Sequence, residues 1–427
     1  MRGLNDKLPT NKGYPPVTVR KERIQADFNA IARCGALEGG GVTRLAFTDA
    51  DQEARRCLAG AMEDAGLEVQ VDALGNMRGR RAGSEDLSPV MVGSHLDTVP
   101  EGGHYDGVIG VLAALEVVRA LNDAGIVTRR PVEVVNFSAE ESSRFGVATL
   151  GSKAMTGKLA GEALQNLKDA DGISLRSALE KAGFEPERLE SARLAPGQAH
   201  AFVEMHIEQG PVLESEGAPV GLVTAIAAPT RFRVTIAGRA DHSGTTPMGM
   251  RRDALAGAAE IVLGVERIAA GKAEGRTVGT VGALRVEPGV MNVVPARVEL
   301  GIDLRDIDGP RKRRTAEQVQ AMMREVADRR GLEVDWEVLC DDAPVPLSER
   351  IVSVLEEAAA AAGVQARKMP SGAGHDAMNL AAITEAGMIF VPSVGGISHN
   401  VAEKSRMDDI AAGTEVLLRA VTVLAGE

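Results

Sequence analysis

The sequence predicts an α/β protein built from two domains, and three observations lead to this prediction. The chain has 427 residues, which is too many for one ordinary hydrophobic core. Short apolar runs separated by a helical pattern indicate a mostly parallel sheet with helices on its faces. The middle third instead follows the order strand, helix, strand, strand, helix, strand, which is typical of a ferredoxin-like domain.

The elements of the parallel sheet follow one another from the N-terminal side. Residues 29–66 have a helical pattern, including a helix that begins at Thr48 and Asp49 and ends at Gly66. The segment 108–125 repeats apolar residues with helical periodicity and predicts a helix of about four turns. Four apolar runs, each followed by polar or glycine-rich residues, predict the strands: residues 89–93, 131–137, 201–207 and 388–392.

The ferredoxin-like pattern lies in the middle of the chain. Its strands are expected at residues 231–238, 277–288, 296–306 and 332–339, and its helices at residues 250–270 and 314–331. We therefore expect an inserted domain at residues 227–341. The sheet domain is then discontinuous: it consists of residues 18–226 and 342–427, and the parallel sheet resumes after the insertion.

Charge and cysteine content exclude several classes of partner. The net charge is −12, whereas binding to nucleic acid needs a clustered basic surface. The three cysteines lie far apart and form no CxxC pair, so the sequence signals neither a disulfide framework nor a thiolate zinc site. We find no leader-like apolar region and no run of about 18 apolar residues. We expect a cytoplasmic protein with a small-molecule partner and with no nucleic-acid or membrane partner.

Chemically active side chains gather where the predicted parallel strands end. They are His95 and Asp97 after the first run, Asp106 before the helix, Glu140 and Glu141 after the second run, His206 in the third, and His399 after the fourth. Ligands of open α/β sheets bind beyond the carboxyl ends of the strands, so these side chains are expected to converge. An isolated glutamate pair is usually solvated and a lone histidine is usually structural. Convergence at one predicted edge favours a shared site over these separate explanations.

Imidazole and carboxylate ligands without thiolates suit zinc, manganese, cobalt or nickel. Two histidines with a shared carboxylate suit a pair of ions, which at about 3.5–4 Å apart share a hydroxide and polarise a carbonyl. We assign the bridge to Asp106, because a carboxylate reaches two ions with its two oxygens. Asp97 is expected to hold the second N–H of the His95 imidazole. Of Glu140 and Glu141, one binds metal while its neighbour accepts a proton from water.

Eight motifs from Gly39 onward carry a resemblance to a known family. They are GSHLDTVPEGGHYDGVIGVLAALE, FSAEESSRFGVATLGSKAMTG, MHIEQGPVLE, DHSGTTPMGMRRDAL, GVMNVVP, LRD, SGAGHDAMNLA and GISHN. On these motifs the chain resembles the amidase, hydantoinase and carbamoylase family, a branch of the dinuclear metallopeptidase-like amidohydrolases. The resemblance implies a zinc-exopeptidase-like catalytic domain and an inserted lid and dimerisation domain, and it implies a homodimer.

The resemblance also implies a division of the metal ligands between two ions. The ligands of one ion would be His95, Asp106 and His206, and those of the other would be Asp106, Glu141 and His399. Glu140 would be the general base, with Asp97 in support. The sequence departs from the family pattern at Ser142, where a glycine is expected after the paired glutamates, so we expect a hydroxyl to change the wall of the substrate site or the backbone turn there.

Five residues outside the ligand set would line the substrate site. The resemblance implies that Arg305 binds the substrate carboxylate and that His242 helps to stabilise the tetrahedral oxyanion, in the neighbouring subunit if the insertion reaches across a dimer. Gln209, Asn292 and the glycine-rich loop at Gly374 would complete this set.

Simpler structural explanations exist for three of these residues. A guanidinium fits a carboxylate with two hydrogen bonds, but Arg305 also has Asp303 and Asp306 as ion-pair partners within its own strand. His242 could cap the following helix, and Asn292 could stabilise the turn in which it lies.

We expect a metal-dependent amidohydrolase that cleaves the carbamoyl group of an N-carbamoyl-L-amino acid to the amino acid, ammonia and carbon dioxide. Its cofactors would be two divalent ions per subunit, and its substrate would carry a carboxylate. The same motifs would serve allantoate amidohydrolase, the first alternative, and then β-ureidopropionase. An aminoacylase or dipeptidase is a further alternative. A metal-binding scaffold without turnover is the alternative outside enzymes.

Overall fold

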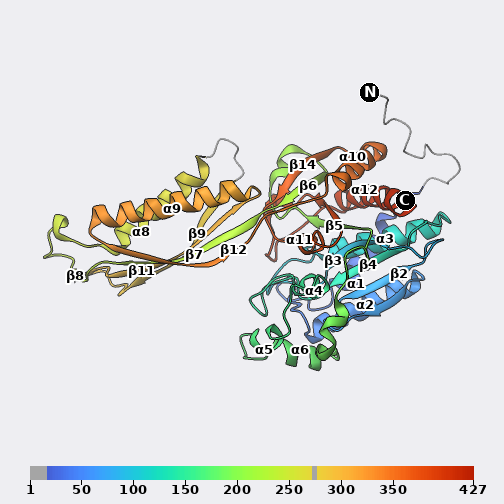
Figure 1. Ribbon diagram of the computed structural model, residues 1–427, viewed down its shortest axis with the longest axis horizontal. Helices are drawn as coiled ribbons and strands as arrows, with labels where there is room; N and C mark the ends of the chain where they lie inside the picture. The colour runs from blue at the N-terminus through green and yellow to red at the C-terminus, as the bar shows by residue number, and fades with distance from the viewer. Residues whose placement is uncertain (1–16, 272–276) are drawn as a thin grey trace. The chain divides into compact units, whose positions relative to one another are not determined.

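A large mixed sheet and a smaller antiparallel sheet organise the protein (Figure 1). The computed structural model describes residues 17–271 and 277–427, so the N-terminal residues 1–16, on which part of the leader prediction rests, lie outside the described residues. The chain divides into two units. The first contains the described residues up to Thr224 together with Leu347–Met369 and His375–Glu427, and the second contains Ala225–Pro346 and Pro370–Gly374.

The large sheet has nine strands in the order β1-β2-β4-β3-β5-β15-β6-β13, with β14 also paired to β6. Its strands are β1 (Glu68–Val71), β2 (Met77–Arg81), β3 (Val90–His95), β4 (Val132–Phe137), β5 (Ala201–Ile207), β6 (Val220–Ile226), β13 (Val345–Pro346), β14 (Ala366–Ser371) and β15 (Glu385–Val391). The four central strands β4, β3, β5 and β15 run parallel, as expected. Antiparallel pairs flank them on both sides. Four carboxyl ends therefore meet at one edge.

Helices of the first unit pack on this sheet or on the loops beside it, with their apolar residues directed inward. They are α1 (Lys21–Ile31), α2 (Asp49–Asp64), α3 (Val108–Asp123), α4 (Leu150–Met155), α5 (Ala163–Asn166), α6 (Leu175–Lys181), α7 (Val212–Glu216), α10 (Glu349–Ala362), α11 (Ala377–Leu380) and α12 (Met407–Gly426), with 3₁₀ turns at Pro186–Ala192 and Val394–Gly396. Helix α3 is buried almost throughout, as its continuous apolar sequence predicts. It lies directly on β5, since a Cβ at Gly110 would come within 2.1 Å of the Met205 carbonyl oxygen.

The second unit has the predicted order of strands and helices. Its strands are β7 (Ala228–Ala237), β9 (Val278–Glu287), β11 (Arg297–Asp306) and β12 (Glu333–Asp341), its helices are α8 (Ala254–Ala270) and α9 (Gly309–Arg330), and a short ribbon pairs β8 (Asp241–His242) with β10 (Val293–Val294); Met248–Met250 form a 3₁₀ turn. All neighbours in the order β12-β7-β11-β9 are antiparallel. Burial alternates along β11, and one face of the sheet packs against both helices (Figure 1).

The α/β class with a mostly parallel central region is thus confirmed, and two features differ from the expectation. The hairpin β1–β2 was not predicted, because β1 is short and mostly exposed and β2 is mainly arginine and glycine, so neither strand forms an apolar run. The second unit also includes residues 370–374, beyond the expected limits of 227–341. One reason is a hydrogen bond from the Arg305 guanidinium to the Gly372 carbonyl, which ties this loop to β11.

The described residues contain no helix with the length and apolar character required to cross a membrane.

A buried arginine joins α1 to the loop that follows β3. Arg44 is fully buried, and its Nε donates to the carbonyl of Leu96 at 2.7 Å while its Nη1 donates to the carbonyl of Cys34 at 2.8 Å. Leu96 directly precedes Asp97, whereas Cys34 follows α1. The interaction therefore fixes the position of the loop that carries Asp97 relative to the helix layer.

Replacing Arg44 with methionine should lower the free energy of unfolding by about 2–5 kcal/mol, because each buried carbonyl that loses its donor costs about 1–3 kcal/mol. Urea-induced unfolding followed by circular dichroism measures this loss. The matched control is Arg33→Met, because Arg33 is exposed. Equal stability of the two variants would contradict the role of Arg44.

Candidate metal centre

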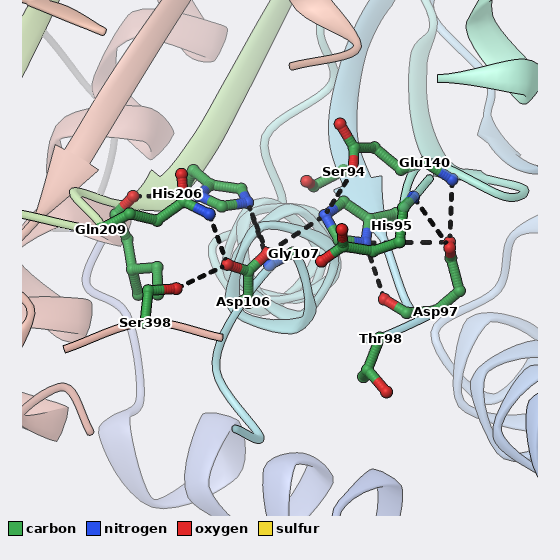
Figure 2. Close-up of polar contacts among 12 residues, drawn as sticks. Ser94, His95, Asp97, Thr98, Asp106, Gly107, Glu140, His206, Gln209 and Ser398 are labelled. Atoms are coloured by element: carbon green, nitrogen blue, oxygen red, sulfur yellow. Dashed lines mark hydrogen bonds and ion pairs between the residues drawn. The ribbon is translucent and has the colours of Figure 1, made fainter. Parts of the chain in front are cut away.

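The carboxyl ends of the four parallel strands carry the predicted ligands. His95 is the last residue of β3, and His206 lies near the end of β5. Glu141 follows β4, and His399 lies in the loop after β15. Asp106 precedes α3, and Figure 2 shows its carboxylate between the His95 and His206 side chains. The carboxyl ends of the parallel strands therefore bring these residues together, as the sequence pattern indicates.

Two groups of possible ligands share Asp106. One contains His95, Asp106 and His206, and the other contains Asp106, Glu141 and His399, with all ligand atoms of a group within 4.8 Å of one another. Asp106 Oδ1 lies 3.4 Å from His95 Nε2 and 3.2 Å from His206 Nε2. Asp106 Oδ2 lies 3.4 Å from His399 Nε2, which is 3.3 Å from Glu141 Oε1. Each oxygen of one carboxylate thus belongs to a different group, as a bridge requires.

The two buried histidines are oriented as metal ligands usually are. His95 Nδ1 lies 2.9 Å from the Asp97 carbonyl oxygen, and His206 Nδ1 lies 2.9 Å from the Ile207 carbonyl oxygen. A carbonyl only accepts, so each Nδ1 carries the proton and donates it. Without an ion, a charged ring donates from Nε2 to Asp106, whereas a neutral ring of this tautomer would offer the Nε2 lone pair to an ion bound beside Asp106. The donor set, its nitrogen and oxygen chemistry and its orientation all fit divalent ions of the zinc or manganese type.

The electrostatics of the site also attract cations. Burial alone would raise the pKa of Asp106, but the charges and hydrogen bonds of His206, His399 and His95 together hold it well below its usual value. The hydrogen bonds of His399 to Asp106 and Glu141 raise the pKa of this imidazole to about 11. The carboxylates therefore stabilise positive charge strongly at this point of the structure.

Asp97 contacts the His95 imidazole through its main chain and the glutamate pair through its carboxylate. Its main-chain carbonyl rather than its carboxylate accepts the His95 Nδ1–H, since Asp97 Oδ1 is 3.8 Å from that nitrogen. The carboxylate instead accepts the backbone N–H groups of Glu140 at 3.1 Å and Glu141 at 3.0 Å. Ala139, just before the pair, has a φ of 52°, so the main chain turns sharply there. Asp97 thus holds both glutamates by their backbone.

Glu140 lies beside the first ligand group without belonging to it. Its Oε2 is 3.8 Å from His95 Nε2, and its side chain is almost fully buried. Burial raises the pKa of Glu140 well above its usual value, against the opposing charge of His95. A carboxylate with a raised pKa is suited to accept a proton near neutral pH. This geometry supports the predicted general base, whose role stays a prediction.

Gln209, which was predicted, and His375, which follows Gly374, adjoin the ligands. Gln209 donates from Nε2 to Asp106 Oδ2 at 2.6 Å, and its Oε1 is buried without a hydrogen-bond partner among the described residues. His375, from the glycine-rich loop, meets His206 edge to face, with ring centroids 4.6 Å apart. Ser142, where a glycine is expected, has an ordinary negative φ, so the turn accommodates a side chain.

The other predicted substrate residues lie in the second unit, and they do not form one cluster. His242 and Asn292 are neighbours on the ribbon of β8 and β10, where the Asn292 carbonyl accepts the Ser243 N–H at 3.1 Å. This ribbon comes just before β11, whereas Arg305 is near the end of that strand. From Arg297 to Arg305 an extended strand covers about 27 Å at ~3.4 Å per residue. Arg305 is therefore separated from the other two.

Arg305 has the ion pair that the simpler explanation predicted. Its Nε and Nη2 bind the two oxygens of Asp303 at 3.0 and 3.2 Å, and its Nη1 donates to the Gly372 carbonyl at 2.8 Å. A guanidinium has five N–H donors, so one N–H on each terminal nitrogen is left. Arg305 also lines a cavity of about 610 Å³ together with Val278, Ile302 and Leu339. Gly374 belongs to the same loop as Gly372.

His242 is not a helix cap. The N-cap of α8 is Asp253, whose carboxylate accepts the N–H groups of Leu255 and Ala256. His242 Nδ1 accepts the Gly244 N–H at 3.1 Å, which places the ring proton on the exposed Nε2. An N–H that faces solvent is available to an oxyanion.

Sequence reasoning missed one buried carboxylate of this site, Glu403. It accepts hydrogen bonds from the backbone of both Asp106 and His399. It lies in an irregular loop, where no periodicity or strand end marks a residue as buried. The only available signal was its position, four residues after His399.

Comparisons with known proteins agree with this geometry. The sequence pattern of peptidase family M20/M25/M40 matches residues 91–423. An N-carbamoyl-L-amino acid amidohydrolase from Geobacillus stearothermophilus is 45% identical over 408 residues, 95% of this chain and 99% of that protein. The allantoate amidohydrolase of Escherichia coli is 37% identical over 404 residues, 94% of this chain and 97% of that protein. The crystal structure of an amidase of the hydantoinase/carbamoylase family from Burkholderia multivorans has a TM-score of 0.91 and 39% identity, covering 97% of this chain and 100% of that one.

The fold, the paired ligand groups and these similarities define a hydrolase of amide C–N bonds with a metallopeptidase-like architecture. The chain belongs to peptidase family M20/M25/M40, which is metal-dependent, and its resemblance to the hydantoinase and carbamoylase branch is confirmed.

Two equivalents of divalent metal should bind per chain, and removing a ligand of the second group should leave one. Glu141→Ala and His399→Ala each delete a ligand that the first group does not use. Metal content after dialysis, measured by mass spectrometry, gives the stoichiometry. His200→Ala is the control, since His200 pairs with Glu427 instead. Two retained ions in both ligand variants would contradict the assignment.

Proposed function

We propose that the protein hydrolyses N-carbamoyl-L-amino acids to the amino acid, ammonia and carbon dioxide. The observation that carries this proposal is the position of Glu140, buried and 3.8 Å from His95, next to two ligand groups that share Asp106. The similarity to an N-carbamoyl-L-amino acid amidohydrolase over 95% of this chain supports the choice of substrate.

Each proposed step uses a group whose position is described above. Two divalent ions held by the ligand groups would act as Lewis acids and lower the pKa of water. Glu140 takes a proton from the water that attacks the ureido carbonyl carbon and later delivers it to the nitrogen of the amino acid. The C–N bond then breaks as the amine leaves, and the carbamic acid that remains decomposes to ammonia and carbon dioxide. The exposed Nε2–H of His242 donates to the oxyanion of the tetrahedral intermediate. Asp97 keeps the Glu140 backbone fixed meanwhile.

The cavity beside Arg305 favours an amino-acid derivative with an apolar side chain. The two remaining N–H groups of Arg305 suit the substrate carboxylate, and the exposed side chains of Val278 and Leu339 offer apolar contacts next to it. Allantoate carries a second ureido group instead of an apolar side chain, and such a group loses hydrogen bonds against apolar walls. Allantoate is therefore the second candidate, supported by the similarity to an allantoate amidohydrolase.

A homodimer would bring together the predicted substrate residues that lie far apart within the second unit of one chain. Arg305 and the ribbon with His242 and Asn292 lie at opposite ends of β11, about 27 Å apart along a rigid strand. A carbamoyl amino acid is much shorter than this distance. We therefore propose that one substrate meets Arg305 of one chain and His242 of a second chain.

The location of the protein in the cytoplasm stays a prediction.

With manganese supplied, the protein should release ammonia from N-carbamoyl-L-methionine faster than from allantoate or N-carbamoyl-β-alanine. Glu140→Gln should lower kcat by about 10²–10⁴, the usual contribution of a general base, while two metal ions stay bound. Ammonia release and metal content are measured on the same samples.

Glu101→Gln is the control for this substitution, because Glu101 is exposed. Inactivity of the unmodified protein on all three compounds would refute the ureido substrate class. Unchanged turnover by Glu140→Gln would remove Glu140 from the mechanism.

Arg305→Lys should raise the KM for N-carbamoyl-L-methionine about tenfold or more with a smaller change in kcat, because an ammonium cannot bind a carboxylate with two parallel hydrogen bonds. The carboxamide of the same compound lacks the carboxylate and should be hydrolysed alike by both forms. Arg233→Lys is the control, since Arg233 pairs with Glu337 on the same sheet. An equal KM shift for acid and amide would argue against carboxylate recognition by Arg305.

A further inference from the structure

A single buried carboxylate connects the two loops that carry Asp106 and His399. Glu403 is 5% exposed. Its Oε1 accepts the backbone N–H groups of Tyr105 at 3.0 Å and Asp106 at 3.1 Å. Its Oε2 lies 2.9 Å from Ser398 Oγ and accepts the His399 N–H at 3.3 Å. Both oxygens are thus fully used, one for each loop.

The surroundings of Glu403 show that this arrangement is closely packed. A Cβ at Gly103 would lie 2.2 Å from Glu403 Oε1, so the loop before Asp106 can approach the carboxylate only with glycine at this position. Ser398 Oγ is also 3.0 Å from Asp106 Oδ2, and Figure 2 shows Ser398 directed at that carboxylate. His399 has a φ of 53°, a conformation that a non-glycine residue keeps only when its neighbours hold it.

We propose that Glu403 is a positioning residue that fixes His399 relative to Asp106 and so sets the affinity of the second ligand group for its ion. The inference rests on the proposed metal centre and goes beyond it, since Glu403 is not a member of either ligand group. Glu403 acts through the backbone of two ligands from different loops. In the first group, which also contains His95 and His206, Glu403 holds the backbone of Asp106 alone.

The hydrogen-bond pattern predicts which ion a glutamine at this position would affect. Glutamine has one accepting oxygen and one donating NH₂ group. Its oxygen is expected to face Tyr105 and Asp106, because two backbone N–H groups there need an acceptor. Its NH₂ can then donate to Ser398 Oγ, while the His399 N–H loses its acceptor. The disturbance falls on His399 and hence on the second group.

Glu403→Gln should therefore weaken the second ion about ten- to hundredfold, the usual effect of losing a residue that orients a metal ligand, and change the affinity of the first by less than about threefold. Stepwise titration of the metal-free protein with Mn²⁺ or Zn²⁺ in a calorimeter measures both affinities without substrate. Glu214→Gln is a matched control, since Glu214 accepts the Gly395 N–H of the same loop but contacts no proposed ligand. It should leave both affinities unchanged.

Near-UV circular dichroism of the metal-free variants distinguishes a loss of ligand positioning from a loss of folding. Ser398→Ala is a second variant, and it keeps the Glu403 carboxylate. It should weaken the second ion less than Glu403→Gln does, because the His399 N–H keeps its acceptor. Unchanged affinity for the second ion in Glu403→Gln would overturn the proposal. Equal weakening of both ions, or loss of the near-UV spectrum, would also overturn it and leave Glu403 with a general structural role.

The outcomes also separate this proposal from the proposed function. If the unmodified protein binds two ions and Glu403→Gln loses the second, the positioning role holds even where no ureido compound is hydrolysed. If ammonia is released from N-carbamoyl-L-methionine but Glu403→Gln binds the second ion normally, only the positioning role fails.

Discussion

The two oxygens of Asp106 impose the constraint on which the site depends, because each faces a different set of partners. Oδ1 meets His95 and His206, which are fixed on strands β3 and β5, while Oδ2 meets His399 from a loop. A strand fixes the positions of its side chains, whereas a loop needs further contacts to fix them. Glu141 and His399 lie in irregular segments. Ala139 and His399 have positive φ values, and each of these costs about 1–3 kcal/mol. The surrounding structure must offset this strain.

Buried carboxylates provide that support by accepting backbone N–H groups. Asp97 accepts those of Glu140 and Glu141, and Glu403 accepts those of Asp106 and His399. The same use of carboxylates concentrates negative charge in a buried region, which is unfavourable unless cations balance it. Burial accordingly raises the pKa of Asp97 to about 6. Structural support and cation affinity therefore arise from the same side chains.

The sequence predicted those parts of the site that follow from regular structure. His95 and His206 lie in parallel strands whose apolar runs were visible, and parallel strands bring their carboxyl ends to one edge. Glu403 was missed because it lies in a loop, and loop contacts depend on tertiary structure rather than on periodicity. The sequence also did not reveal that Asp97 reaches His95 through its main-chain carbonyl, since a two-residue spacing does not show which oxygen faces a ring. The hairpin β1–β2 was missed because polar strands give no apolar signal.

The second unit carries the physical argument for the proposed homodimer. Strand β11 pairs along its length with β7 and β9, so it cannot bend to bring Arg305 toward the ribbon with His242. The same ribbon region exposes Met248, Met250 and Met291, with Met291 fully exposed at 102%. Flexible apolar side chains at a protruding position favour contact with another protein surface. Because these methionines accompany the residues that lie far from Arg305, a second copy of the chain would both cover them and bring His242 to a substrate bound elsewhere.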